Sequence, residues 1–162
     1  MFHLLIPLVP LAIAGALFLK RKSLAYGCPI ILTLLKMLLT QISFIFLFTG
    51  LSLFLTVFLT RRLKEFLGES LIAVAAYAFI GVAIFELVSN FGVWLVGGCL
   101  SSEGSLYSLS FASLLECYRE AFFYSASHFL RDVPLTVLVV KAGSFVGKIL
   151  TLKEPISKQV TI

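Results

Sequence analysis

Hydrophobic residues come in long runs along this chain, and short polar segments separate the runs. About 20 apolar residues in a helix match the hydrocarbon core of a membrane, which is about 30 Å thick. The pattern therefore predicts six membrane-spanning helices. Their bounds are Met1 to Leu19, Leu24 to Leu39, Ile42 to Thr60, Ser70 to Leu95, Phe111 to Leu130 and Val133 to Leu152.

The polar segments between the runs are short. The first run is followed, not preceded, by Lys20, Arg21 and Lys22, so we expect a retained span and not a signal peptide. Arg131, Asp132 and Pro134 are predicted to form the turn between the last two spans. No linker divides the chain, so residues 1–152 are predicted to form one six-helix membrane domain, with residues 153–162 as a polar C-terminal tail.

Composition agrees with this pattern. Of the 162 residues, 60% are hydrophobic and only 13% are charged, and the mean hydropathy is +1.07. Soluble domains have about 45–50% apolar and about 25% charged residues, so we expect an all-α polytopic membrane protein. The net charge of +5 comes mainly from basic clusters beside the hydrophobic runs, which favours contact with anionic membrane lipids and not with nucleic acid.

Motifs for covalent or metal catalysis are missing from the sequence. It contains no GxSxG, HExxH or P-loop pattern, so we expect no enzyme activity, no cofactor and no metal site. Cys28, Cys99 and Cys117 have no CxxC spacing, and we expect them to be packing residues.

Charged residues inside the hydrophobic runs are the main functional indication. A charge at bilayer depth costs at least about 2.5–3.5 kcal/mol, so it normally faces a partner, a cavity or a ligand. The six such residues are Lys36, Glu86, Glu116, Arg119, Glu120 and Lys141.

In the fourth span, Glu86, Asn90 and Trp94 are spaced by four residues and fall near one helix face. A carboxylate, an amide and an indole in line could bind a small polar or aromatic ligand, and the carboxylate could hold a cation or a protonated amine. In the alternative interpretation, Trp94 belongs to an interfacial aromatic belt and Glu86 pairs structurally with Lys36 or Lys141.

The fifth span carries a second cluster, in which Glu116 and Glu120 are one turn apart and Arg119 can pair with Glu116. This cluster could line a ligand or ion site, or it could be solvated at the interface if the helix begins later. Lys141 in the sixth span is predicted to be a counter-ion for these carboxylates. His128 is predicted to be interfacial and not a metal ligand.

Small residues are spaced by four in the first and sixth spans, as Ala12 and Ala16 and as Gly143 and Gly147. Such pairs let another backbone approach closely in a membrane. They predict either packing within the bundle or a docking face for a partner subunit.

Several segments resemble an uncharacterised family of small bacterial membrane proteins. The most specific is Asn90 to Trp94, followed by Cys117-Tyr118; Phe129-Leu130-Arg131-Asp132 and the stretch from Pro10 to Phe18 also fit. That family is itself similar to the substrate-binding S components of energy-coupling factor (ECF) transporters. The resemblance covers most of the chain.

The resemblance implies a six-helix bundle in the bacterial inner membrane that captures a vitamin or a related micronutrient. It also implies docking on a transmembrane coupling subunit driven by two ATPases, which Ala12 and Ala16 would meet. The ligand would then lie between spans four, five and six, within these residues: Glu86, Asn90, Trp94, Glu116, Arg119, Glu120 and Lys141. Two alternatives stay open: a non-transporting membrane assembly protein, and a small ion-coupled carrier that acts alone.

Overall fold

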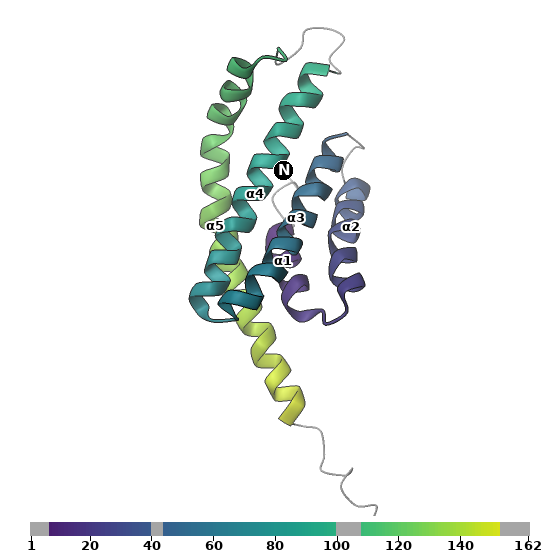
Figure 1. Ribbon diagram of the computed structural model, residues 1–162, viewed down its shortest axis with the longest axis vertical. Helices are drawn as coiled ribbons and strands as arrows, with labels where there is room; N and C mark the ends of the chain where they lie inside the picture. Colours follow the sequence, from purple (N-terminus) through teal and green to yellow (C-terminus); the bar gives the residue numbers. More distant parts are fainter. Residues whose placement is uncertain (1–6, 40–43, 100–107, 153–162) are drawn as a thin grey trace, which may run out of the picture.

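The computed structural model describes residues 7–39, 44–99 and 108–152, and these residues are almost entirely helical. Five helices follow one another along the chain (Figure 1): α1 (Leu8–Phe18), α2 (Lys22–Leu39), α3 (Ile45–Leu67), α4 (Leu71–Cys99) and α5 (Phe111–Leu152). The prediction of an all-α fold is confirmed. The polar tail predicted at residues 153–162 lies outside the described residues.

The predicted turn between spans five and six was wrong. α5 is one continuous helix of 42 residues with Pro134 inside it, so at 1.5 Å per residue it is about 63 Å long. The side chain of Arg131 donates to Asp132 over 2.6 Å, and Asp132 is 4% exposed. The two charges that indicated a turn therefore neutralise each other within the helix.

α5 runs antiparallel to α4 over the whole length of α4 (Figure 1). Contacts along the pair define the register: Trp94 bonds to Ser113 near the start of α5, and Lys141 bonds to the carbonyl of Glu69 just before α4 begins. Lys141 therefore lies beside the α3–α4 turn. The sequence had predicted a position inside a membrane span. The remainder of α5 projects beyond that turn.

Two of the described helices are long and apolar enough to cross a membrane, Ile45–Leu67 and Leu71–Gly97. This judgement rests on length and composition alone. The helix α1, with 11 residues, is about 16 Å long. The structure does not confirm six spans, and the predicted fifth and sixth spans are one continuous helix, α5.

The core forms around α1, which packs against each of the other four helices. Its most buried side chains are those of Val9, Ala12, Ile13 and Ala16, each at most 2% exposed. They meet buried residues of α3 and α4 such as Leu53, Val57, Val74 and Tyr77. A short apolar helix is enclosed in this way by the longer ones.

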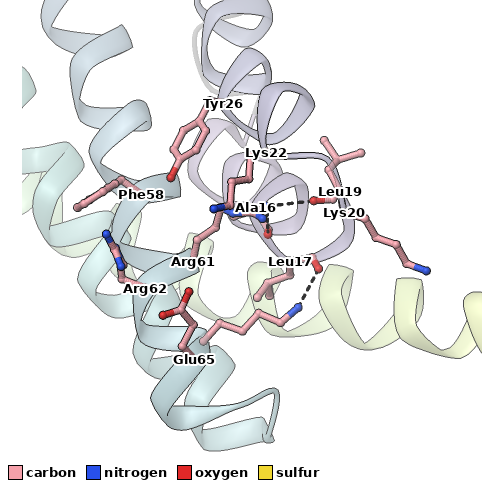
Figure 2. A pocket seen from close by; sticks show the side chains of 11 residues that line it. Ala16, Leu17, Leu19, Lys20, Lys22, Tyr26, Phe58, Arg61, Arg62 and Glu65 are labelled. Carbon is pink, nitrogen blue, oxygen red and sulfur yellow. Dashed lines mark hydrogen bonds between the residues drawn. The ribbon is translucent and has the colours of Figure 1, made fainter.

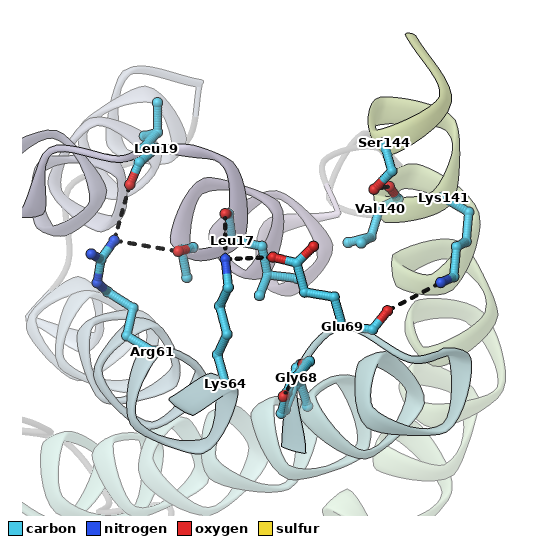
Figure 3. A network of polar contacts seen from close by, with 11 residues as sticks. Leu17, Leu19, Arg61, Lys64, Gly68, Glu69, Val140, Lys141 and Ser144 are labelled. Atoms are coloured by element: carbon cyan, nitrogen blue, oxygen red, sulfur yellow. Dashed lines mark hydrogen bonds and ion pairs between the residues drawn. The ribbon is translucent and has the colours of Figure 1, made fainter. Parts of the chain in front are cut away.

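Basic side chains of α3 satisfy the carboxyl end of α1. The last carbonyl groups of a helix have no partner within it, and Arg61 Nη1 donates to the carbonyls of Ala16 (3.3 Å) and Leu19 (3.0 Å) (Figure 2). Lys64 Nζ donates to the carbonyl of Leu17 (3.1 Å) and pairs with Glu69 (2.5 Å) (Figure 3). This polar network joins α1, α3 and the α3–α4 turn.

Small residues bring α3 and α4 close together. Thr49, Ser52, Thr56 and Thr60 of α3 are all at most 2% exposed, and Thr56 donates both to its own helix and to the carbonyl of Gly81 (3.4 Å). Farther along α4, a Cβ atom added at Gly92 would lie 2.4 Å from Cγ of Phe48. Small residues that let a neighbouring helix approach closely are typical of helix association in membranes.

We expect Gly92→Ala to destabilise the protein although alanine is the better helix former. The added Cβ would also lie 2.6 Å from Cβ of Phe48, which cannot move without its backbone, and overpacking of this kind costs about 1–3 kcal/mol. Gly27→Ala is the control, because a Cβ there meets nothing within 4 Å and should stabilise α2 by up to about 1 kcal/mol. Thermal unfolding in detergent, followed by circular dichroism, should show shifts of opposite sign. A higher midpoint for both variants would contradict the α3–α4 contact.

We also expect Arg61→Gln to lower the free energy of unfolding by about 1.5–3 kcal/mol, since hydrogen bonds from charged groups are worth about that much. Arg62 is next in sequence, and its guanidinium lies over the Phe58 ring, 5.6 Å from the centroid, with no hydrogen bond to another described residue. Arg62→Gln should therefore cost less than about 1 kcal/mol. Equilibrium unfolding of both variants is the measurement, and equal losses would argue against the capping role of Arg61.

Candidate functional site

A buried carboxylate between α4 and α5 is the centre of the candidate site. Glu86 is 9% exposed. Its carboxylate accepts hydrogen bonds from Asn90 Nδ2 (3.2 Å) and Ser125 Oγ (2.7 Å), and it pairs with Nδ1 of His128. Three polar groups therefore surround one charge, as a buried carboxylate requires.

Helix spacing and register place these groups. Glu86 and Asn90 are one turn apart on α4, and Ser125 and His128 are one turn apart on α5, so each pair shares a helix face. Two further contacts hold the helices together next to them: the Tyr118 hydroxyl donates to the carbonyl of Leu87 (2.6 Å), and the buried Cys117 thiol lies 3.6 Å from the carbonyl of Asn90.

A cavity of about 290 Å³ opens beside this carboxylate. Its polar lining consists of Glu86, Ser89, Asn90, Glu120 and His128. Phe85, Val93, Ala121 and Cys117 supply the apolar part. The lining combines two carboxylates, one imidazole, one amide and one hydroxyl, and all of its residues belong to α4 or α5.

This lining suits a cation better than an anion. Two carboxylates face one histidine, and carboxylate oxygens are acceptors for an ammonium or a protonated heterocycle. Among the described residues, no group of three or more histidine, cysteine, aspartate or glutamate side chains is arranged to hold a metal ion. A small organic cation therefore fits the chemistry of the cavity.

The structure brings together three of the predicted ligand-binding residues, Glu86, Asn90 and Glu120, around this cavity. Trp94 lies on the same helix beyond it. Its indole N–H is 3.2 Å from both the carbonyl of Ser108 and the hydroxyl of Ser113. Trp94 thus ties the start of α5 to α4 and does not line the cavity.

Glu116 and Arg119 lie on the outer side of α5. They form an ion pair with each other one turn apart, and their side chains are 48% and 75% exposed. They do not belong to the cavity lining. α5 begins at Phe111, as predicted, so the later start on which the solvated alternative depended does not occur, although these two residues are exposed.

The predicted lysine partners of Glu86 were wrong. Lys141 contacts the Glu69 carbonyl (3.2 Å) at the α3–α4 turn, and Lys36 lies in the last turn of α2 with its ammonium 5.9 Å from the Phe46 ring centroid. Glu86 is balanced by groups of α4 and α5, because the antiparallel register places Ser125 and His128 opposite Glu86 and Lys141 beside the α3–α4 turn.

The predicted docking residues lie in internal contacts. Ala12 and Ala16 are 0% and 2% exposed, and a Cβ on Gly143 would come within 2.7 Å of the Phe18 ring. These positions favour packing within the chain, the first of the two interpretations. Gly147 is in α5 as well, but its surroundings fall outside the described part of the structure.

Sequence reasoning missed Ser125 and His128. The sequence did contain a signal, because Ser125 and His128 are three residues apart and so share one helix face. To predict that this face lies opposite Glu86, the register between α4 and α5 must be known, and hydropathy does not give it.

Comparison with known protein families assigns the chain to one of them. The sequence profile of one family matches residues 2–151, which is nearly the whole chain. The chain belongs to DUF6580, a family of unknown function. Membership agrees with the expected uncharacterised family, and the DUF6580 description names no activity or ligand. No curated protein and no solved structure matches the chain.

The Glu86–His128 pair of this DUF6580 chain should be strongly coupled. In a double-mutant cycle with Glu86→Gln and His128→Gln, we expect a coupling energy above about 1.5 kcal/mol, because removing one partner leaves the other polar group buried. The control cycle uses Glu116→Gln and Arg119→Gln, whose exposed pair should couple by less than about 0.5 kcal/mol. Equilibrium unfolding in mixed micelles measures both. Similar coupling energies in the two cycles would remove the case for a buried polar centre.

Proposed function

We propose that this chain is a membrane-embedded binding protein that captures a small organic cation in the cavity between α4 and α5. The observation that carries the proposal is the Glu86 carboxylate, held by Asn90, Ser125 and His128 beside a cavity of about 290 Å³. A buried charge within an apolar helix is costly. Charged residues in such helices therefore usually mark functional positions.

The size and charge of the cavity limit the ligand class. Binding cavities for small molecules usually measure about 300–1,000 Å³, so this one suits a ligand at the small end. The lining has two carboxylates, Glu86 and Glu120, and one imidazole, His128. A protonated amine or a cationic nitrogen heterocycle would replace water there and pair with the carboxylates.

Within this proposal, the chain serves as the substrate-binding subunit of an ECF-type uptake system for a micronutrient. The resemblance at Asn90 to Trp94 and Cys117-Tyr118 motivates this step, and the first of these segments borders the cavity. Because Ala12 and Ala16 are covered by the chain itself, a coupling subunit would dock on another surface. The apolar α3 and α4 would lie in the inner membrane.

A stand-alone ion-coupled carrier is the second candidate. The observation that favours it is the hydrogen-bonded Glu86–His128 pair with Glu120 on the same cavity, since chains of carboxylates and histidines carry protons in transporters. Uptake by the purified protein alone in ATP-free liposomes would support the carrier. Binding without uptake would support the subunit.

We expect purified wild-type protein to bind a member of a panel of amine-bearing vitamins and simple organic cations, measured by isothermal titration calorimetry. Glu86→Gln and Glu120→Gln should each weaken that binding about ten-fold or more, because a hydrogen bond to a charged group contributes about 1.5–3 kcal/mol. Glu116→Gln is the matched control, since it removes a carboxylate from the same helix as Glu120 but outside the cavity.

Two results would contradict the cavity as the binding site. One is that no panel member binds the wild-type protein, which would favour the assembly-protein alternative with purely structural charges. The other is that Glu116→Gln weakens binding as much as Glu86→Gln, because the effect would then reflect overall charge.

A further inference from the structure

A second and larger cavity lies at the polar end of the helices, where α1 ends and α2 begins. Its volume is about 410 Å³, and Figure 2 shows the residues that line it, which come from α1, α2, α3 and the α1–α2 connection. Five cations and one carboxylate line it: Lys20, Lys22, Arg61, Arg62, Lys64 and Glu65.

Part of this charge is already used by the fold, and part is available. Arg61 and Lys64 donate to the carbonyls at the end of α1, and Lys64 also pairs with Glu69. Arg62 packs over the Phe58 ring and is exposed. Lys20 and Lys22 have neither a hydrogen bond nor an ion pair to any described residue. Figure 2 shows Lys20 extending outward, so Lys22 is the lysine whose ammonium is free to contact a ligand in the cavity.

We propose that this cavity binds a phosphate-bearing anion. Guanidinium and ammonium groups are the side chains that bind phosphate, arginine through paired N–H donors and lysine as a point charge. The amino end of α2 begins at Lys22, and its free N–H groups and helix dipole also favour an anion. Glu65 is the one acidic group that opposes such a ligand in the lining.

The headgroup of an anionic lipid is the favoured source of that phosphate. The lining includes the aromatic rings of Tyr26 and Phe58, and Tyr26 packs against Phe54 with ring centroids 5.3 Å apart. Phe54 and Phe58 are 43% and 38% exposed. An apolar surface therefore leads away from the basic cavity along α3, as acyl chains attached to a bound phosphate require.

Native mass spectrometry of the full chain in neutral detergent can test this site, with phosphatidylglycerol as the probe and phosphatidylcholine as the neutral reference. We expect selective binding of phosphatidylglycerol. Arg62→Gln should weaken that binding about five-fold, the effect of one basic residue at an anionic membrane surface. Glu65→Gln should strengthen it, because the opposing carboxylate is lost.

Arg21→Gln is the matched control. Arg21 stands between Lys20 and Lys22 and is exposed, but it does not line the cavity, so its loss should change binding less than two-fold, or about 0.4 kcal/mol. Equal losses for Arg21→Gln and Arg62→Gln would mean general surface charge and would overturn the proposal. A lack of selectivity for phosphatidylglycerol over phosphatidylcholine, together with no binding of inorganic phosphate, would overturn it as well.

Calorimetry with inorganic phosphate and glycerol phosphate distinguishes the two sources. Competition by either compound at micromolar concentration would support the anion site with a soluble ligand, and lipid binding that neither compound displaces would support the headgroup. The result is separate from that of the α4–α5 cavity, because Glu86→Gln and Glu120→Gln should leave phosphatidylglycerol binding unchanged. Failure of one proposal therefore leaves the other standing.

Discussion

The structure depends on how the carboxyl end of α1 is capped. α1 has only 11 residues, and its last carbonyl groups point away from the apolar core without helical partners. Leaving them unsatisfied in apolar surroundings would cost several kcal/mol each. Arg61 and Lys64 of α3 supply the donors, so a short apolar helix can be enclosed by four others. The same two side chains form one wall of the basic cavity, which makes that cavity a by-product of the cap.

A similar requirement shapes the α4–α5 interface. Glu86 is buried in an apolar helix, and its charge is balanced by Asn90 on its own helix and by Ser125 and His128 on α5. Among the described residues, no buried side-chain nitrogen or oxygen is left without a hydrogen-bond partner. Buried polar networks stabilise a fold only when every member is satisfied. Three members of this network, Glu86, Asn90 and His128, therefore both join α4 to α5 and line the cavity.

The sequence predicted the helical class and the position of most helices, because hydropathy reports directly on apolar segments. It predicted Glu86, Asn90 and Glu120 near one another, because these residues are unusual in such segments. It failed at Arg131 to Pro134, where local composition indicates a turn but the Arg131–Asp132 contact keeps the charges inside one helix. It failed for His128 and Lys141 for a related reason: only the antiparallel register of α5 decides which charged residue meets Glu86 and which meets the α3–α4 turn.

The continuity of α5 constrains how a ligand could enter the α4–α5 cavity. The first part of α5 carries Ser125 and His128, and the later part holds Gly143 against Phe18 of α1. Moving the whole helix would break both sets of contacts together. Pro134 lies between them and has no N–H to donate to the carbonyl of Leu130, so α5 lacks one hydrogen bond at this point. The missing hydrogen bond therefore lies between the residues that hold α5 against α4 at the cavity and the residue that packs α5 against α1.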